Sequence, residues 1–335
     1  MANSKVALVG SESLLAREVR DIAAETAGLD LILIASGDEN AGTLTSVAGE
    51  PALVGVLNAA SLSDARAVIL AGGSKSARKA LDLLGDPPEA AVIDLTYTAE
   101  ERPDARLRAP AVEAGAESDA REAAVHVIAH PAAIAMALFL RRVHFHYAVR
   151  RAVIQVFAPA SEHGTQGVEE LKEQTVSLLT FKSLPKTVFD SQLGFSLLAR
   201  LGQEAQVTIE QSEMRIERHL ASLLAAEGDG EGAPMPSLRV IQAPVFHGYS
   251  FSAWVQFEDT PEIEVLEDSL GTAGIDVLGA EFDPPNNVGQ AGQGGIAVGA
   301  IAPDRNDALA CWFWFVADNL RLHAENAVAV ARELV

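Results

Sequence analysis

The first part of the chain alternates short apolar runs, rich in β-branched residues, with segments of helical periodicity. Between the first two runs, Leu14–Ala27 repeats its apolar side chains at the spacing of an amphipathic helix. The order strand, turn, helix, strand is typical of βαβ units and predicts a parallel sheet. The predicted strands are Lys5–Val9, Leu31–Ala35, Ala67–Leu70 and Ala91–Leu95.

After Leu140 the pattern changes to strand-like and helix-like segments typical of an α+β domain. The predicted strands here are Val149–Phe157, Arg239–Ala243 and Ser252–Glu258, and the predicted helices are Gly167–Leu179 and Ser212–Ala226. Asp307–Val335 is predicted to be a long apolar helix that places Cys311, Trp312 and Trp314 in a core or an interface. A chain of 335 residues with 49% apolar content is expected to form two domains.

Charge and composition restrict the classes of partner. A formal net charge of -21 makes nucleic acid an unfavourable partner, because binding would bring like charges together. The single cysteine, Cys311, excludes an internal disulfide, and the N-terminus lacks the layout of a signal peptide, so we expect a cytoplasmic protein. The most apolar run, Val125–Leu140, is too short to cross a bilayer comfortably and predicts a buried core segment instead of a membrane partner.

Two local groups of residues resemble functional sites, but we interpret both as structural. His144 and His146 could share one metal ion if they lay on a strand, but no third ligand stands nearby, so we predict no metal site. Ser161, Glu162 and His163 are contiguous and lack the sharp turn that exposes a hydrolase nucleophile, so we interpret them as a loop.

Six stretches spread over nearly the whole chain stand out by their order and spacing: KVALVG at residues 5–10, Ala71–Ser76, Val92–Thr96, Val168–Gln174, Ala243–Ser250 and Trp314–Arg321. Together they resemble the aspartate-semialdehyde dehydrogenase family. The resemblance implies a Rossmann-like nucleotide-binding domain at residues 1–130, with a C-terminal helix at 307–335 that packs back on it. It implies an α+β dimerisation and substrate domain at residues 131–306, a homodimer, and NADP as cofactor.

The residues that carry the family's chemistry are replaced. The family's nucleophilic cysteine aligns with Ala133, whose methyl group cannot attack an acyl carbon. The general-base histidine aligns with Tyr249, which titrates near ~10 and is a poor base at neutral pH. His247 would lie on the same face of an extended strand as Tyr249 and is the candidate substitute base.

Substrate recognition is also altered. Gln242 and Glu100 align with the family's two substrate-binding arginines, so the cationic groups that hold a carboxylate or phosphate are missing. Ala158 aligns with the glutamine that positions the thioester intermediate. The family's substrate-binding glutamate falls within Glu210–Glu217, where the register stays open.

The nucleotide loop retains one glycine of the family's glycine pattern, Gly10, and Glu12 is expected to direct a carboxylate toward the pyrophosphate. Asp38 and Glu39 stand where the family has an arginine for the phosphate of NADP, so NAD(P) is expected to bind weakly. The resemblance implies that any cofactor contacts come from Gly10, Ser11, Ser13, Gly72, Gly73 and Asn319.

These replacements lead to one main hypothesis and two alternatives. The main hypothesis is a catalytically degenerate, Usg-like homologue that acts as a binding or regulatory protein, with a regulatory protein as its partner. One alternative is a functional NAD(P)-dependent aspartate-semialdehyde dehydrogenase of amino-acid biosynthesis. The other is an enzyme that performs different chemistry in the same cleft.

Overall fold

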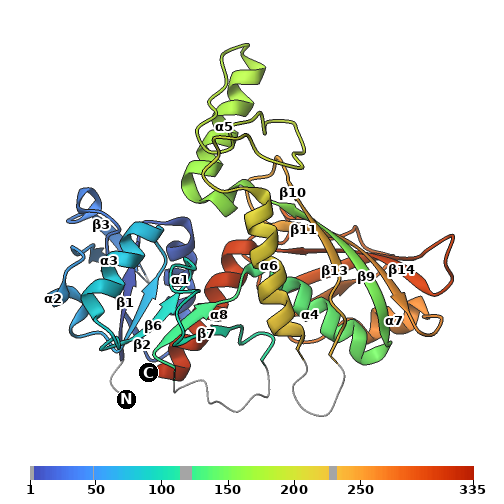
Figure 1. Ribbon diagram of the computed structural model, residues 1–335, viewed down its shortest axis with the longest axis horizontal. Helices are drawn as coiled ribbons and strands as arrows, with labels where there is room; N and C mark the ends of the chain where they lie inside the picture. Colours follow the sequence, from blue (N-terminus) through green and yellow to red (C-terminus); the bar gives the residue numbers. More distant parts are fainter. Residues whose placement is uncertain (1–3, 48, 114–122, 226–231) are drawn as a thin grey trace. The chain divides into compact units, whose positions relative to one another are not determined.

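The computed structural model describes residues 4–47, 49–113, 123–225 and 232–335 (Figure 1). The chain divides into two compact units: residues 1–129 with 323–335 form unit 1, and residues 130–322 form unit 2. Within the described residues, no helix has both the length and the apolar composition needed to cross a lipid bilayer.

Unit 1 is built on a six-stranded sheet of order β2-β1-β5-β6-β8-β7, and each pairing described in it is parallel. A short antiparallel hairpin, β3-β4, follows β2. The elements are β1 (Ser4–Val9), α1 (Leu14–Glu25), β2 (Leu29–Ile34), η1 (Asp38–Asn40), β3 (Leu44–Val47), β4 (Glu50–Leu53), α2 (Ala59–Leu62), β5 (Ala67–Leu70), α3 (Ser74–Leu84), β6 (Ala91–Asp94), β7 (Ala105–Arg108) and β8 (Val125–Ile128).

The central strands of unit 1 are buried on both faces, which is why they appear in the sequence as continuous apolar runs and not as alternating ones. Val9, Val68 and Val92 lie in one hydrophobic cluster with Ala77 and Ala80 of α3. The predicted parallel α/β sheet is therefore confirmed, and four of its strands were located from the sequence. The burial of Val125–Leu140 is also confirmed, although a strand and a helix share that run.

Unit 2 contains a mixed six-stranded sheet of order β10-β9-β11-β14-β13-β12, with parallel pairs only at its two ends among the described pairings. Helices α4 and α6 pack against each other (Figure 1). The elements are α4 (Pro131–His146), β9 (Val149–Ala158), η3 (Ala160–His163), α5 (Gly164–Leu179), α6 (Ile209–Leu224), β10 (Ser237–Gln242), β11 (Tyr249–Phe257), α7 (Ile263–Leu270), β12 (Ile275–Leu278), β13 (Ile296–Pro303), β14 (Ala310–Ala317) and the start of α8 (Asn319–Leu334), most of which belongs to unit 1. Ala226, the last residue of a predicted helix, lies outside the described residues.

Two buried side chains of α5 hold the segment that follows it. The Glu170 carboxylate accepts hydrogen bonds from the backbone N–H groups of Thr187 and Val188, both at 2.6 Å, and from Phe189 at 3.2 Å. The Gln174 amide accepts from the N–H groups of residues 193 and 194 and donates to two carbonyls in the same segment. The motif at 168–174 therefore orders a loop that has few backbone partners of its own.

The predicted helix at 307–335 is wrong in its first third. Ala310–Ala317 is strand β14, paired with β11 and β13, and the helix begins at Asn319. A short apolar run cannot be assigned to strand or helix by periodicity alone, and here sheet pairing decides. Cys311 is buried as predicted, but Trp312 is 40% exposed and is not a core residue.

The helical part of the C-terminal segment continues into unit 1 from His323 onward. There the Asn326 side chain accepts a hydrogen bond of 3.0 Å from the N–H of Ala111, and Glu333 forms an ion pair of 2.7 Å with Arg108 at the end of β7. These contacts join the end of α8 to the sheet of unit 1.

The His144/His146 pair does not lie on a strand. Both residues belong to the last turn of α4, where cationic or polar groups interact favourably with the helix C-terminus. The His144 Nδ1 atom accepts a hydrogen bond of 3.1 Å from the N–H of Val149, so its role is to close the turn into β9. The part of the chain that the structure describes contains no group of three metal-binding side chains.

Candidate functional site

Ala133 lies in the first turn of α4 and is completely buried. The helix starts here because Pro131 occupies its first position, where a missing N–H carries no penalty, and because His130 caps it. The Nδ1 atom of His130 accepts a hydrogen bond of 3.2 Å from the N–H of Ala132. The position predicted to have lost its thiol therefore presents a methyl group inside the protein.

Glu162 lies between His130 and Tyr249, on a 3-10 turn that no sequence pattern connects with either residue. The Nε2 atom of His130 is 2.8 Å from one carboxylate oxygen of Glu162, and the Tyr249 hydroxyl donates to the other oxygen. Three distant parts of unit 2 thus meet at one carboxylate.

Burial by itself raises the pKa of Glu162, but the charge and hydrogen bond of His130, together with the Tyr249 hydroxyl, outweigh burial and lower the pKa to about 2. The carboxylate is therefore ionised at neutral pH, when it accepts from both neighbours. An ionised carboxylate with two donors is a stable acceptor, and its hydrogen bonds are stronger than those between neutral groups.

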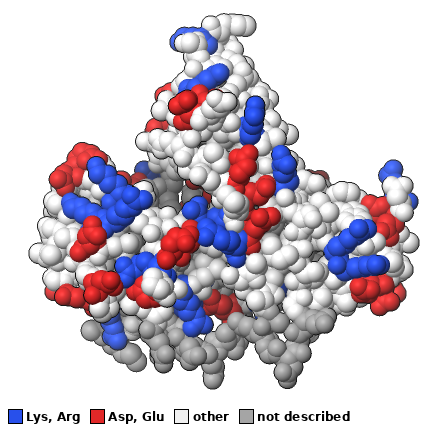
Figure 2. Space-filling view, in the orientation of Figure 1, with Lys and Arg blue, Asp and Glu red and all other residues white. Residues whose placement is uncertain are grey.

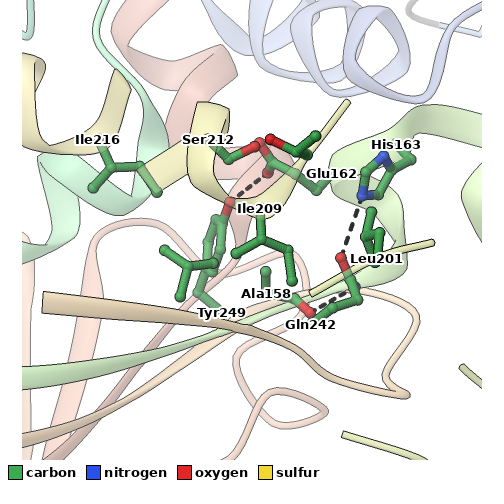
Figure 3. A pocket seen from close by; sticks show the side chains of 11 residues that line it. Ala158, Glu162, His163, Leu201, Ile209, Ser212, Ile216, Gln242 and Tyr249 are labelled. Carbon is green, nitrogen blue, oxygen red and sulfur yellow. Dashed lines mark hydrogen bonds between the residues drawn. The ribbon is translucent and has the colours of Figure 1, made fainter. Parts of the chain in front are cut away.

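A small recess, with about 10 Å³ of space that the centre of a water molecule can occupy, adjoins this carboxylate (Figure 3). The Glu162 side chain is 19% exposed, so the recess reaches it. Apolar side chains make up about half of the lining, and the lining residues include neither Lys nor Arg. They are Ala158, Glu162, His163, Leu201, Thr208, Ile209, Ser212, Ile216, Val240, Gln242 and Tyr249.

Gln242 and Ala158, both predicted from the family alignment, lie together in this recess (Figure 3). The Gln242 amide donates to the carbonyl of Ala158 at 2.9 Å, and its oxygen lies 3.2 Å from Nε2 of His163. Burial lowers the pKa of His163, which favours the neutral imidazole. The polar atoms of Gln242, Ala158 and His163 therefore largely bond to one another instead of facing a substrate.

His247 is not placed as predicted. Strand β11 begins at Tyr249, and Gly248 adopts a left-handed conformation with φ of 82°, so His247 and Tyr249 do not share a strand face. The Nδ1 atom of His247 is buried without a hydrogen-bond partner among the described residues. The backbone turn at Gly248 is the reason that these residues, although two apart in the sequence, do not lie on one strand face.

Asn319, predicted to contact the cofactor, uses its side chain within unit 2. Its Oδ1 atom accepts a hydrogen bond of 3.0 Å from the N–H of Gly248, and its amide group bonds to the hydroxyl of Ser161 at 3.1 Å. It is only 3% exposed. These contacts fasten the turn before Tyr249 and the turn that carries Glu162.

The other predicted nucleotide contacts lie in two loops of unit 1. Gly10 has φ of 81°, and a Cβ there would lie 2.2 Å from the Cα of Gly72, so close backbone approach requires glycine. Ser13 caps α1, and its hydroxyl donates to the carbonyl of Ala71 at 2.7 Å. Ser11 is buried and Gly73 is the residue before α3. These residues therefore join the loops after β1 and β5.

The carboxylate of Glu12, which is predicted to lie near the pyrophosphate, is held by the neighbouring loop. It accepts hydrogen bonds from Ser36 and Asn40 in the loop after β2. Asp38 and Glu39, in the same loop, are exposed in η1. Glu100 is half-buried in the turn that follows β6, where its N–H bonds to the carbonyl of Tyr97 at 3.4 Å.

The sequence reasoning missed Glu162 as a site residue. An acidic side chain among the small residues of the turn at 159–164 was a weak signal, because such turns are usually solvated. In the structure, Glu162 is distinguished by its hydrogen bonds with His130 and Tyr249, which are 32 and 87 residues away in the sequence.

Comparisons with known proteins bear on the whole arrangement. Residues 140–322, more than half of the chain, match the dimerisation domain of semialdehyde dehydrogenases. A USG-1 protein homolog of Pseudomonas aeruginosa is 32% identical over 229 residues, which is 67% of this chain and 66% of that protein. An aspartate-semialdehyde dehydrogenase of Aquifex aeolicus is 26% identical over 347 residues, covering 99% of this chain and 98% of that protein.

Among solved structures, aspartate semialdehyde dehydrogenase II of Vibrio cholerae superposes with a TM-score of 0.84 and 23% identity, covering 100% of this chain and 98% of that chain. At this identity the likeness concerns the fold. With the dimerisation-domain match, the two-sheet architecture and the retained segments, the chain belongs to the aspartate-semialdehyde dehydrogenase family.

Proposed function

We propose that this protein is a catalytically degenerate, Usg-like member of its family that acts as a binding or regulatory protein. The observation that carries the proposal is the carboxylate of Glu162, bonded to His130 and Tyr249, beside a buried Ala133. An acyl-transfer site needs a nucleophile and a base within hydrogen-bond reach of each other. This part of unit 2 offers an acceptor with two donors in their place.

Substrate charge points the same way. The family's reaction places a carboxylate and a phosphate in the site, and both are recognised by cationic fork donors. The recess contains the Glu162 carboxylate and no Lys or Arg. An acidic substrate brought there would meet a like charge, so we propose that the recess rejects aspartate semialdehyde and its phosphorylated precursor.

Activity measurements test the proposal directly. Purified protein would be assayed with aspartate semialdehyde, phosphate and NADP, beside a family enzyme that has the cysteine and histidine. Loss of a nucleophile from a catalytic unit costs on the order of a millionfold in rate, so we expect no signal above background. Saturable, phosphate-dependent reduction of NADP within a few hundredfold of the control would establish the alternative, an active dehydrogenase of amino-acid biosynthesis.

Cofactor binding is proposed to be weak. Family membership and the parallel sheet of unit 1 support a site for NAD(P), whereas Glu12, Asp38 and Glu39 place acidic groups in its loops. We propose that NADP binds no tighter than about millimolar, which corresponds to roughly 4 kcal/mol. Calorimetric titration at physiological salt that gave a micromolar dissociation constant would refute this.

The partners proposed are a second copy of the chain and a regulatory protein. The match of residues 140–322 to a dimerisation domain supports the homodimer. The absence of a competent nucleophile at position 133 supports a role in binding. On the face shown in Figure 2, acidic and basic side chains are interspersed over the described residues. Such a face would complement a partner protein whose own surface carries charges of both signs.

A further inference from the structure

The loop after β2 presents three hydrogen-bond donors to a single carboxylate. The backbone N–H of Ser36 lies 3.0 and 3.3 Å from the two oxygens of Glu12, and the Ser36 hydroxyl and the Asn40 side-chain amide both donate to Oε1, the latter at 3.1 Å. Glu12 reaches them from the loop after β1, which is 24 residues earlier. A carboxylate from one loop is thus enclosed by the donors of another.

In doubly wound nucleotide-binding folds, the end of the second strand is where the adenosine ribose lies, and its 2′ substituent is recognised there. A converging backbone N–H, hydroxyl and amide form a donor set suited to an anion such as a phosphate monoester. Here the anion that fills the donor set belongs to the chain itself. The cofactor that the family implies therefore does not fit this loop as it stands.

We infer that Glu12 is an internal occupant of a latent phosphate-monoester site formed by Ser36 and Asn40. A ligand phosphate could reach the donors only by displacing the carboxylate. Because the carboxylate is attached to the same unit, it competes at a high local concentration that a dilute ligand does not match. The inference concerns unit 1 and stands independently of the function proposed for unit 2.

Glu12 could have a purely structural role, in which it joins two loops and no latent phosphate site exists. Removal of the carboxylate distinguishes this role from occupation of a phosphate site. The variant Glu12→Ala removes the carboxylate and keeps the three donors. The matched control, Glu25→Ala, removes the same charge from an exposed position at the end of α1, outside the loop after β2, and leaves Glu12 in place. Adenosine 2′-monophosphate would be titrated calorimetrically into the wild-type protein and both variants.

The expected result is a dissociation constant for adenosine 2′-monophosphate at least about tenfold lower in Glu12→Ala than in the wild type. Glu25→Ala should stay within about twofold, because exposed charges are strongly screened. Equal gains in the two variants would reduce the effect to general charge and overturn the inference. No gain in Glu12→Ala would show that the donors do not form a site.

Thermal unfolding with sodium formate provides a second readout, because formate supplies a carboxylate without the chain. Glu12→Ala should unfold at a lower temperature than the wild type, and tens of millimolar formate should raise its midpoint by several degrees more than that of the wild type or Glu25→Ala. If Glu12→Ala does not fold, Glu12→Gln retains one acceptor oxygen without the charge. That variant should bind adenosine 2′-monophosphate more tightly than the wild type, and unchanged affinity would overturn the inference.

Discussion

The Nε2 atom of His130 lies 2.8 Å from the carboxylate of Glu162, and the hydroxyl of Tyr249 bonds to the other oxygen of the same group. His130 is the N-cap of α4, so one imidazole both starts a helix and fixes the carboxylate. The same arrangement leaves Ala133, three residues later, sealed in the core. The contact therefore orders this part of unit 2, where we propose that the family's reactive pair has been lost.

Replacing Glu162 with Gln should destabilise unit 2 by about 1–3 kcal/mol at pH 7, because one of two donors then faces an amide N–H₂ group. Burial opposes ionisation, but His130 and Tyr249 lower the pKa of Glu162 to about 2, below its ordinary value of 4.5. A carboxyl group whose pKa is lowered by folding adds stability at pH values above its ordinary pKa. That stability is lost as the pH falls from about 4.5 toward about 2. Urea unfolding at several pH values would measure it.

The stability gap between the wild type and Glu162→Gln should accordingly be widest above about pH 5 and narrow as the pH falls below about 4.5. Glu169→Gln, an exposed position on α5, is the matched control and should show almost no gap. A gap for Glu162→Gln that did not change with pH would contradict an ionised, hydrogen-bonded carboxylate.

The double variant Ala133→Cys with Tyr249→His should remain inactive with aspartate semialdehyde, phosphate and NADP. Nucleophile and base act only when the reacting carbonyl is held about 3 to 3.5 Å away in the correct orientation. The Glu162 carboxylate remains in the recess, and neither Gln242 nor Ala158 restores a positioning group. Steady-state assays showing phosphate-dependent turnover within a few hundredfold of an ordinary family enzyme would mean that the binding site is intact.

The thiol introduced by Ala133→Cys should be unreactive in the folded protein, because the position is completely buried. The single native cysteine, Cys311, is also buried, and burial raises its pKa to about 11, which suppresses the reactive thiolate. A colorimetric thiol reagent should therefore report almost no rapid reaction in the native variant and two thiols in urea. Rapid modification of one thiol under native conditions would place position 133 in an open cleft.

Replacing Glu170 with Gln should loosen the segment after α5. Three backbone N–H groups, from Thr187, Val188 and Phe189, lose a charged acceptor, and hydrogen bonds to charged groups contribute about 1.5–3 kcal/mol each. Hydrogen exchange of those three amides should accelerate by at least about tenfold, a change that such a loss more than accounts for. Glu173→Gln, exposed one turn away, should leave them protected, and equal protection in both variants would show that Glu170 does not hold the segment.

Light scattering at micromolar concentration should give a mass near twice the 35.3 kDa of the chain. The reason is the match of residues 140–322 to a dimerisation domain. Dilution should not dissociate the pair readily, since obligate homodimer interfaces are large and apolar. A monomer at all accessible concentrations would remove the homodimer from the proposed function.

The sequence by itself determined the parallel sheet of unit 1, because buried β-branched runs separated by an amphipathic helix leave few other folds. It also determined that a methyl group stands at position 133 and a phenol at position 249 whatever the fold. That these groups replace the family's cysteine and histidine is our proposal. The helix at 164–179 was placed correctly within a few residues for the same reason of periodicity.

Only the tertiary structure decided the contacts between distant residues. Local periodicity could not show that Ala310–Ala317 would pair as a strand, or that Gly248 would turn His247 away from the face of Tyr249. Glu12 and Glu162 both lie in predicted loops, and the fold makes each carboxylate the acceptor of hydrogen bonds from remote segments. A carboxylate's role depends on which donors the fold brings within about 3 Å of it, and sequence spacing does not encode that distance.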